Sequence, residues 1–304
     1  MKVTFLGTGG GIPNPKRNLP SIAVRREGEL LLFDVGEGTQ RQMTLAKVGL
    51  RREMKIFITH MHGDHVLGLP GLIQTMAMLD RDAPLEVYGP QGVKDFVNFI
   101  VKNFHFDLTF QINIYEIEEG VIYQSKEYDV VATWGEHVIP SVAYALVEKE
   151  RAGRFYPEKA EELGVSKGPL WFKLQHGENV QLPNGRIVKA SDVTGPKRPG
   201  RKIVYSGDTR FSDNIVRLAK GADLLIHEST LDDELAERAY DEGHSTPSQA
   251  ALVAKKAGAT KLFLTHISSR YANDASIMVE QARKIFPETY LAEDLMSVEV
   301  PLKK

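Results

Sequence analysis

Short apolar runs alternate with amphipathic stretches along most of the chain. A short apolar run bounded by turn residues predicts a buried strand, whereas apolar residues three or four positions apart predict a helix. We therefore expect helices at Gly38–Val48, closed by Gly49, and from about His65 to Leu79. The expected strands of this half are Lys2–Leu6, Ile22–Arg25, Leu30–Asp34, Lys55–Thr59, Leu85–Tyr88, Gln111–Ile117, Tyr128–Trp134 and Ser141–Val147.

This alternation stops after Val147 and resumes near Lys202. Between them, from Glu148 to about Arg201, the chain is charged and rich in Gly and Pro, with one short helix expected at Pro157–Leu163. We interpret this stretch as an insertion, not as a second domain with its own core. Alternating strands and helices elsewhere predict an α/β fold with helices layered on sheets. The elements expected after the insertion are strands Lys202–Ser206, Ala222–Ile226, Lys261–Thr265 and Ser297–Val300, and helices Thr246–Ala257 and about Ala275–Ile285.

The composition is that of a globular protein. The 304 residues, 42% of them hydrophobic, fit one large domain or two ordinary ones with ample material for a core. Without cysteine, any metal site must use His, Asp, Glu or water. No apolar run reaches a signal peptide or a membrane span, so a cytoplasmic protein without a membrane partner is expected. The formal charge of −2 argues against indiscriminate nucleic-acid binding.

The segment His60-Met61-His62-Gly63-Asp64-His65 carries four metal-ligating side chains in six residues. His60 and His62 are two apart on an extended segment, which places both imidazoles on the same side. Gly63 allows a tight turn, after which Asp64 and His65 begin the next helix. The alternative interpretation is a polar loop in which Asp64 caps that helix.

Three further candidate ligands each follow a β-rich segment. His137 comes after Val130–Trp134, Asp208 after Lys202–Tyr205, and His266 after Lys261–Thr265. Open α/β sheets place ligands beyond the ends of their strands. Taken singly, each residue could equally be a surface histidine or a turn aspartate. Their shared placement favours one metal site with ligands from distant segments.

These residues resemble the ligand set of the metallo-β-lactamase superfamily, and the chain as a whole resembles the short form of the tRNase Z (ribonuclease Z) family. The similarity spans nearly all of the sequence. It is carried by FLGTGGGIP and the following RN, Leu31–Met43 (LLFDVGEGTQRQM), Gly153–Leu170 (GRFYPEKAEELGVSKGPL), YSGDT, HEST, GHST and THISSRY. The resemblance implies an αββα sandwich formed by residues 1–304 as a single domain, with an inserted flexible tRNA-binding arm (exosite) at about 148–201.

The resemblance also implies two zinc ions per chain and a homodimer. One ion would be held by His60, His62 and His137, and the other by Asp64, His65 and His266. Asp208 would bridge them, each ion keeping an open position for a shared hydroxide. Asp34 resembles a family residue that supports the site from behind the ligands.

The implied reaction is removal of the 3′ trailer from precursor tRNA, leaving a 3′-hydroxyl on tRNA and a 5′-phosphate on the trailer. Asp64 would accept the proton of the attacking water. His244, oriented by Glu228, would assist departure of the 3′-oxygen. The alternative, purely structural interpretation of the His244 loop is a helix start at Ser245 or Thr246. The structural and catalytic interpretations are compatible. His227 is open to interpretation as a core histidine.

Candidate substrate contacts fall into three groups. Arg17 and Asn18 match a family segment linked with the CCA end, although the lysine of that segment is displaced by one position. Ser268 and Arg270 follow His266 and could contact the scissile phosphate. Gly168-Pro169 matches the arm that grips the tRNA elbow. The same arm ends in a basic cluster that could contact RNA phosphates or simply be solvated: Arg186, Lys189, Lys197, Arg198, Arg201 and Lys202.

Two other classes of function compete with the endoribonuclease. The first is a small-molecule phosphodiesterase or related hydrolase on the same fold, which would have no need of a basic arm. The second is a non-catalytic RNA-binding module, against which the complete ligand set argues. Fold alone does not decide among them.

Overall fold

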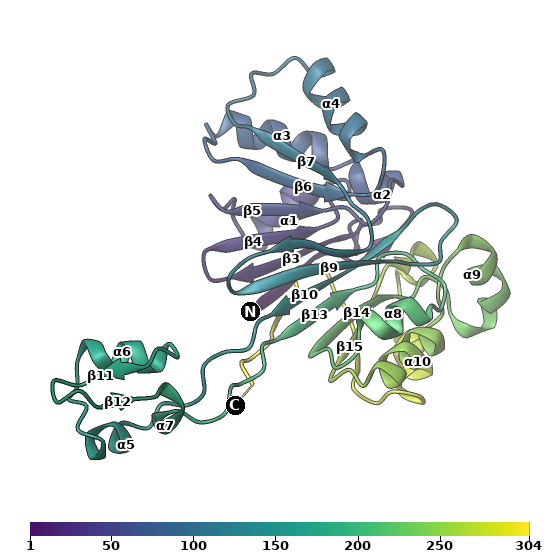
Figure 1. Ribbon diagram of the computed structural model, residues 1–304. Helices are drawn as coiled ribbons and strands as arrows, with labels where there is room; N and C mark the ends of the chain where they lie inside the picture. The colour runs from purple at the N-terminus through teal and green to yellow at the C-terminus, as the bar shows by residue number, and fades with distance from the viewer. Residues whose placement is uncertain (304) are drawn as a thin grey trace. The chain divides into compact units, whose positions relative to one another are not determined.

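The computed structural model describes residues 1–303, which form two compact units coloured along the chain in Figure 1. The larger unit comprises Met1–Ser125, Asp129–Val147 and Lys202–Pro301. The smaller unit comprises Glu148–Arg201, together with Lys126–Tyr128 and the described end of the chain from Leu302. Each unit has an apolar core of its own.

The larger unit contains two sheets of seven strands each. The first has the order β18-β1-β3-β4-β5-β6-β7, and the second the order β17-β15-β14-β13-β10-β9-β8. The first is built from β1 (Lys2–Gly7), β3 (Ser21–Arg26), β4 (Glu29–Phe33), β5 (Met54–Phe57), β6 (Leu85–Gly89), β7 (Ile112–Glu116) and β18 (Ser297–Glu299). The second is built from β8 (Gly120–Gln124), β9 (Tyr128–Trp134), β10 (Val142–Glu148), β13 (Lys202–Tyr205), β14 (Leu224–Glu228), β15 (Leu262–Thr265) and β17 (Thr289–Leu291).

The two sheets pack face to face through aromatic side chains. Tyr144 of the second sheet contacts Phe33 and Phe57 of the first, with ring centroids 5.9 and 5.5 Å apart, and Phe5 stacks on Phe263 at 5.4 Å. Large rings of this kind bury extensive apolar area between sheets. The interface between the sheets is therefore one of the layers of the core.

Helices pack against the other face of each sheet through two further apolar clusters (Figure 1). The first sheet carries α1 (Thr39–Leu45), α2 (Gly63–Val66), α3 (Leu69–Met78) and α4 (Val93–Asn103). The second carries α8 (Asp213–Leu218), α10 (Pro247–Ala257) and α11 (Ser276–Arg283). The layers are thus helix, sheet, sheet and helix, as the resemblance predicts.

The remaining elements of the larger unit are short. They are β2 (Gly9–Gly10), β16 (Ile267–Ser268), α9 (Ala236–Glu242) and the 3₁₀ turns η1 (Asp233–Leu235) and η2 (Ser269–Tyr271). Strand β2 pairs in parallel with β16, which joins the N-terminal glycine loop to the segment after β15. The longest helices, α4 and α10, have eleven residues, and no helix within residues 1–303 could cross a membrane.

The smaller unit contains α5 (Pro157–Glu162), α6 (Pro169–Gln175), β11 (Val180–Gln181), β12 (Ile187–Val188) and α7 (Ala190–Val193). Eight apolar residues, among them Leu174 and Val193, form its buried cluster. The expectation that this stretch has no core of its own is therefore wrong. Its apolar residues are widely spaced among Gly, Pro and charged residues, so their meeting is not visible as a periodic pattern.

All the expected strands are present, with ends shifted by one or two residues, but two helices differ. The helix expected at Gly38–Val48 ends at Leu45, because Lys47 has a positive φ of 53° that no helix accommodates. The helix expected from His65 to Leu79 is two helices, α2 and α3, separated at Gly68. Pro70 can occupy only the first turn of a helix, and a Cβ at Gly68 would lie 2.1 Å from the carbonyl oxygen of Gly36.

Candidate metal centre

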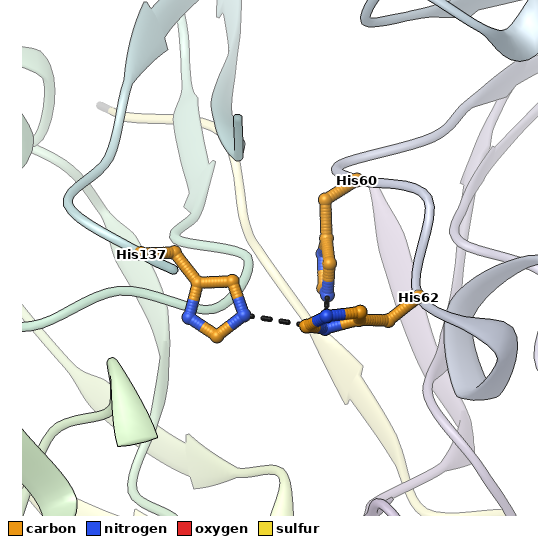
Figure 2. Close-up of side chains that lie close together, drawn as sticks. All are labelled: His60, His62 and His137. Carbon is orange, nitrogen blue, oxygen red and sulfur yellow. Dashed lines mark hydrogen bonds between the residues drawn. The ribbon is translucent and has the colours of Figure 1, made fainter. Parts of the chain in front are cut away.

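Three histidines from two loops of the larger unit converge on one point, as Figure 2 shows. His60 and His62 follow strand β5, and His137 follows strand β9. His60 Nε2 and His137 Nε2 lie 3.1 and 3.3 Å from His62 Nδ1. Three imidazole nitrogens at this spacing can hold one metal ion.

A second group is formed by Asp64, His65 and His266. Asp64 and His65 lie in the single turn of α2, and His266 follows β15. Asp64 Oδ2 is 3.4 Å from His266 Nε2 and 3.7 Å from His65 Nε2. His266 has a positive φ of 58°, a sparsely populated conformation that is concentrated at functional sites.

Asp208 lies between the two groups. Its Oδ2 is 3.6 Å from His60 Nε2, 3.4 Å from His65 Nε2 and 3.2 Å from His266 Nε2. It therefore reaches members of both groups from a fully buried position. This is the placement required of a carboxylate that bridges two ions.

The donor atoms of the cluster are suited to binding metal ions, and two of them lack a hydrogen-bond partner in the part of the chain that the structure describes. Within residues 1–303, the buried His65 Nε2 and Asp208 Oδ1 have no hydrogen-bond partner, although buried polar atoms are normally paired. Burial would raise the pKa of Asp208, but the surrounding histidines outweigh burial and hold it well below its usual value. Burial, and then the neighbouring His65, hold the pKa of His60 well below its usual value. Burial would lower the pKa of His65, but the charges of Asp208 and Asp34 raise it well above its usual value. Carboxylates and imidazoles together are a donor set that suits a divalent cation.

Four of the histidines are oriented by hydrogen bonds at Nδ1, the nitrogen away from the centre. His65 Nδ1 donates to Asp34 at 2.7 Å, and His137 Nδ1 donates to the Gly243 carbonyl at 2.7 Å. Nδ1 of His60 and of His266 pair with hydroxyls at 3.0 and 2.7 Å. Such contacts fix the tautomer that leaves Nε2 free to bind metal.

Asp34 is the hub of this support. Its buried carboxylate also accepts hydrogen bonds from the Tyr205 hydroxyl at 2.9 Å and from the Thr59 hydroxyl. The family resemblance predicts a supporting role for Asp34, but nothing in the sequence predicts one for Thr59, Tyr205 or Thr230, the last of which pairs with His266. No spacing rule marks these hydroxyls, since each is recognisable only once the histidine or the Asp34 carboxylate that it contacts is in place.

Glu228 and His244 form a pair at the edge of the ligand cluster. His244 Nδ1 donates to Glu228 Oε1 at 2.9 Å, and the same nitrogen is 3.8 Å from Asp208 Oδ2. Burial alone would lower the pKa of His244, but the charge and hydrogen bond of Glu228 raise it to about 9. Glu228 is itself fixed by Thr209 N and by the amide and hydroxyl of Thr230.

Three residues in or near the ligand cluster have alternative interpretations in the sequence. Thr246 is the N-cap of α10 and forms a capping box with Gln249, so the helix start and the Glu228–His244 pair coexist. Asp64 does not cap α2, whose N-cap is His62. His227 lies fully buried in β14, with Nδ1 donating to the Glu228 carbonyl, as a core histidine would.

The candidate substrate contacts in the larger unit differ in their exposure to solvent. Arg17 is buried, and its Nη1 donates to Thr8 Oγ1 and to the Ala292 carbonyl, both at 2.7 Å, so it holds its loop together. Asn18 Nδ2 donates to the Glu37 carbonyl. Ser268 is half-buried at the start of η2, and Arg270 is exposed.

The smaller unit holds the other candidates. Gly168 and Pro169 are exposed at the start of α6. One member of the expected basic cluster is not available to RNA: Arg201 forms a mostly buried ion pair with Glu148 at 2.7 Å. Arg186, Lys189 and Lys197 are exposed.

Two family models match the sequence. A beta-lactamase superfamily domain matches residues 172–267, and a model described as anti-Pycsar protein Apyc1 matches residues 1–148.

Full-length relatives are similar over the entire chain. The ribonuclease Z of Methanosarcina acetivorans is 46% identical over 303 residues, covering 100% of this chain and 99% of that protein. The ribonuclease Z of Haloferax volcanii is 48% identical, covering 99% and 95%. Among solved structures, the short form of human tRNase Z is 33% identical with a TM-score of 0.72, covering 99% of this chain and 100% of that one.

Proposed function

This chain belongs to the ribonuclease Z family, and we propose from that premise which residues of its metal centre perform the family's reaction. The protein is an endoribonuclease that removes the 3′ trailer from precursor tRNA, leaving a 3′-hydroxyl on the tRNA and a 5′-phosphate on the trailer. The observation that carries this function is 46% identity to a ribonuclease Z over the whole length of both chains.

The proposed cofactor is a pair of zinc ions. His60, His62 and His137 would hold one, Asp64, His65 and His266 the other, and Asp208 would bridge them. Nitrogen and carboxylate donors without cysteine suit zinc, and the unpartnered Asp208 Oδ1 and His65 Nε2 support two ions around a shared carboxylate. When bound, two such ions lower the pKa of a shared water and neutralise charge on the phosphate.

Asp64 and His244 are the proposed proton-transfer groups. The hydrogen bond from the Gly11 amide to Asp64 Oδ2, at 2.8 Å, keeps this carboxylate oriented at the cluster, where it would accept the proton of the attacking water. Glu228 accepts from His244 Nδ1, which leaves Nε2 as the nitrogen that would give a proton to the departing 3′-oxygen. Against burial, the charge and hydrogen bond of Glu228 raise the pKa of His244, which favours the protonated form that an acid must have.

Residues 148–201 are the proposed tRNA-gripping arm. They contain eleven Lys and Arg against seven Asp and Glu, a formal charge of +4 on a chain whose total is −2. Exposed cations, among them Lys173 and Lys197, and the exposed ring of Phe172 are suited to phosphates and to bases. Gly168 and Pro169 would contact the tRNA within this arm, and Arg270 and Ser268 would act near the scissile bond. Arg17, which is buried, and Asn18 would instead hold the shape of their loop beside the metal centre.

A homodimer is the proposed assembly, formed by the face that α1 and α3 share. The exposed Leu79 lines a mainly apolar pocket of about 310 Å³ together with Met43 and Leu72, and Leu45 and Met78 are exposed on the same two helices. Apolar surface of this kind marks interaction sites on proteins. A cytoplasmic location belongs to the same proposal, because the substrate is a precursor tRNA.

The test is cleavage of a precursor tRNA bearing a 3′ trailer by the metal-loaded protein, with both product ends mapped. Cleavage after the discriminator nucleotide is expected, with the 3′-hydroxyl on the tRNA. An enzyme that leaves the precursor intact but hydrolyses small phosphodiesters would establish the runner-up function, a small-molecule phosphodiesterase or related hydrolase.

A further inference from the structure

Asp294 ties three separate segments of the larger unit together. It lies between β17 and β18 and is half-buried. Thr8 Oγ1 donates to its Oδ1 at 2.7 Å, while Asn18 N and Gln42 Nε2 donate to its Oδ2 at 2.7 and 2.8 Å. One carboxylate therefore holds the beginning and the end of the loop 8–18 and fastens both to helix α1.

This loop, residues 8–18, contacts the metal centre at two places. The Gly11 amide donates to Asp64 Oδ2 at 2.8 Å. Strand β2 pairs with β16, directly after His266, and the Thr8 carbonyl accepts a hydrogen bond from Ile267 N at 2.9 Å. Both contacts concern the second group of candidate ligands, Asp64, His65 and His266.

The fit between the loop and His266 is close. A Cβ added at Gly10 would lie 2.4 Å from His266 Nδ1, so the backbone of the loop lies directly against the imidazole. A small displacement of the loop would therefore move the ring or leave it unsupported. The other group, His60, His62 and His137, has no hydrogen bond to residues 8–18 within the described chain.

We propose that Asp294 is a positioning residue for one half of the metal centre: by closing the loop 8–18, it holds Asp64 and His266 in place. It touches neither substrate nor metal ligand and acts only through the loop. The inference rests on the proposed assignment of Asp64, His65 and His266 as one metal site. It predicts an asymmetric defect, in which one metal site weakens and the other does not.

The test compares zinc binding by apo protein and by Asp294→Asn, in which an isosteric amide replaces an acceptor oxygen with a donor. Bound zinc is measured by elemental analysis after equilibrium dialysis against buffered free zinc. The proposal predicts that one of two binding steps weakens on the order of tenfold, the lower end of effects seen for residues that support ligands. Glu293→Gln, an exposed acid next to Asp294, is the matched control and should bind both ions normally.

A second pair of variants identifies the step. His137→Ala removes a ligand of the first group, so its remaining zinc reports on the Asp64–His266 group. Adding Asp294→Asn to His137→Ala should weaken binding of the remaining zinc ion by the same factor. Adding it to His266→Ala should leave the affinity for the remaining ion unchanged. Thr8→Val removes one of the three hydrogen bonds to Asp294, together with the hydrogen bond that Thr8 Oγ1 accepts from Arg17. It should shift zinc binding in the same direction as Asp294→Asn, which covers the case of a poorly folded Asp294→Asn.

Three results would overturn the proposal. They are unchanged zinc binding by both Asp294→Asn and Thr8→Val with only a lower melting temperature, an equal loss at both sites, or a loss confined to the His60–His62–His137 group. A wild-type protein that binds fewer than two ions would instead refute the dinuclear centre, so the two failures are distinguishable.

Discussion

The two units of this chain differ in charge and in burial of their functional side chains. The larger unit holds all seven candidate metal ligands, most of them buried. The smaller unit holds none of them, and residues 148–201 carry +4, so the rest of the chain carries −6. On net charge alone, a polyanion is attracted to residues 148–201 and, metal ions aside, repelled by the rest of the chain. The difference supports the proposal that RNA affinity and phosphodiester chemistry are supplied by separate parts of the chain.

The apolar cores of the two units differ in size. The larger unit has two extensive apolar clusters on the helix-covered faces of its sheets, which give a rigid base for ligands that must be held within fractions of an ångström. The smaller unit has one cluster of eight small or medium residues. A surface that contacts phosphates tolerates much looser placement than a metal site does.

Asp64→Ala should have the largest effect, because it removes a metal ligand and the proposed base together. We expect turnover to fall by several orders of magnitude on both precursor tRNA and a nitrophenyl phosphodiester, with tRNA affinity little changed. Single-turnover kinetics at saturating zinc, beside a gel shift at fixed salt, measure the two quantities. Near-normal turnover would refute both roles of Asp64. The larger unit would then lose the evidence that its ligand cluster performs the phosphodiester chemistry.

His244→Ala should lower turnover on precursor tRNA by about 10²- to 10⁴-fold while leaving bound zinc unchanged. The loss should be much smaller on a nitrophenyl ester, whose leaving group needs no proton. His176→Ala, an exposed histidine of the smaller unit, is the matched control and should leave the rate on the nitrophenyl ester unaltered. Equal losses on both substrates would mean that His244 only positions neighbouring groups.

Replacing Gly153–Lys197 by a short Gly-Ser linker separates the two units most directly. Arg151 and Arg198, which pair through their backbones, lie just outside the replaced segment and bring its two ends together. The whole apolar cluster of the smaller unit is removed with the segment. We expect KM for precursor tRNA to rise roughly ten- to hundredfold, equivalent to about 1.4–2.7 kcal/mol of binding free energy. Hydrolysis of the small phosphodiester should survive, because every candidate ligand is retained. Unchanged tRNA affinity would show that residues 153–197 are not the clamp.

Single charges within the smaller unit should have the smallest effects. Arg186→Gln or Lys197→Gln should raise KM a few-fold and reduce the slope of log affinity against log salt by about one per lost phosphate contact. Glu178→Gln, an exposed acid of the same unit, is the control and should not weaken binding. An identical salt slope in wild type and both cation variants would exclude phosphate contacts at these positions.

The sequence by itself determined most strands of the two sheets and the local part of the site, but its pattern did not predict helices α4, α8 and α9 or strands β8 and β17. The six residues from His60 to His65 supply four of the seven candidate ligands, because their spacing brings these side chains together. The same patterns misplaced the end of α1 and the break at Gly68. Those depend on a positive φ at Lys47 and on the backbone of Gly36, which no local pattern contains.

Only the tertiary structure decided the partners that come from far along the chain. It sets Asp208 within 3.2–3.6 Å of three histidines from both ligand groups, and it sets Asp294 against Thr8, 286 residues away. It also buries Arg17 and pairs Arg201 with Glu148, although both arginines resemble RNA contacts in the sequence. The physical reason is that charge and hydrogen-bonding capacity are properties of a residue, whereas burial and the identity of its partner depend on how the sheets, helices and loops pack together.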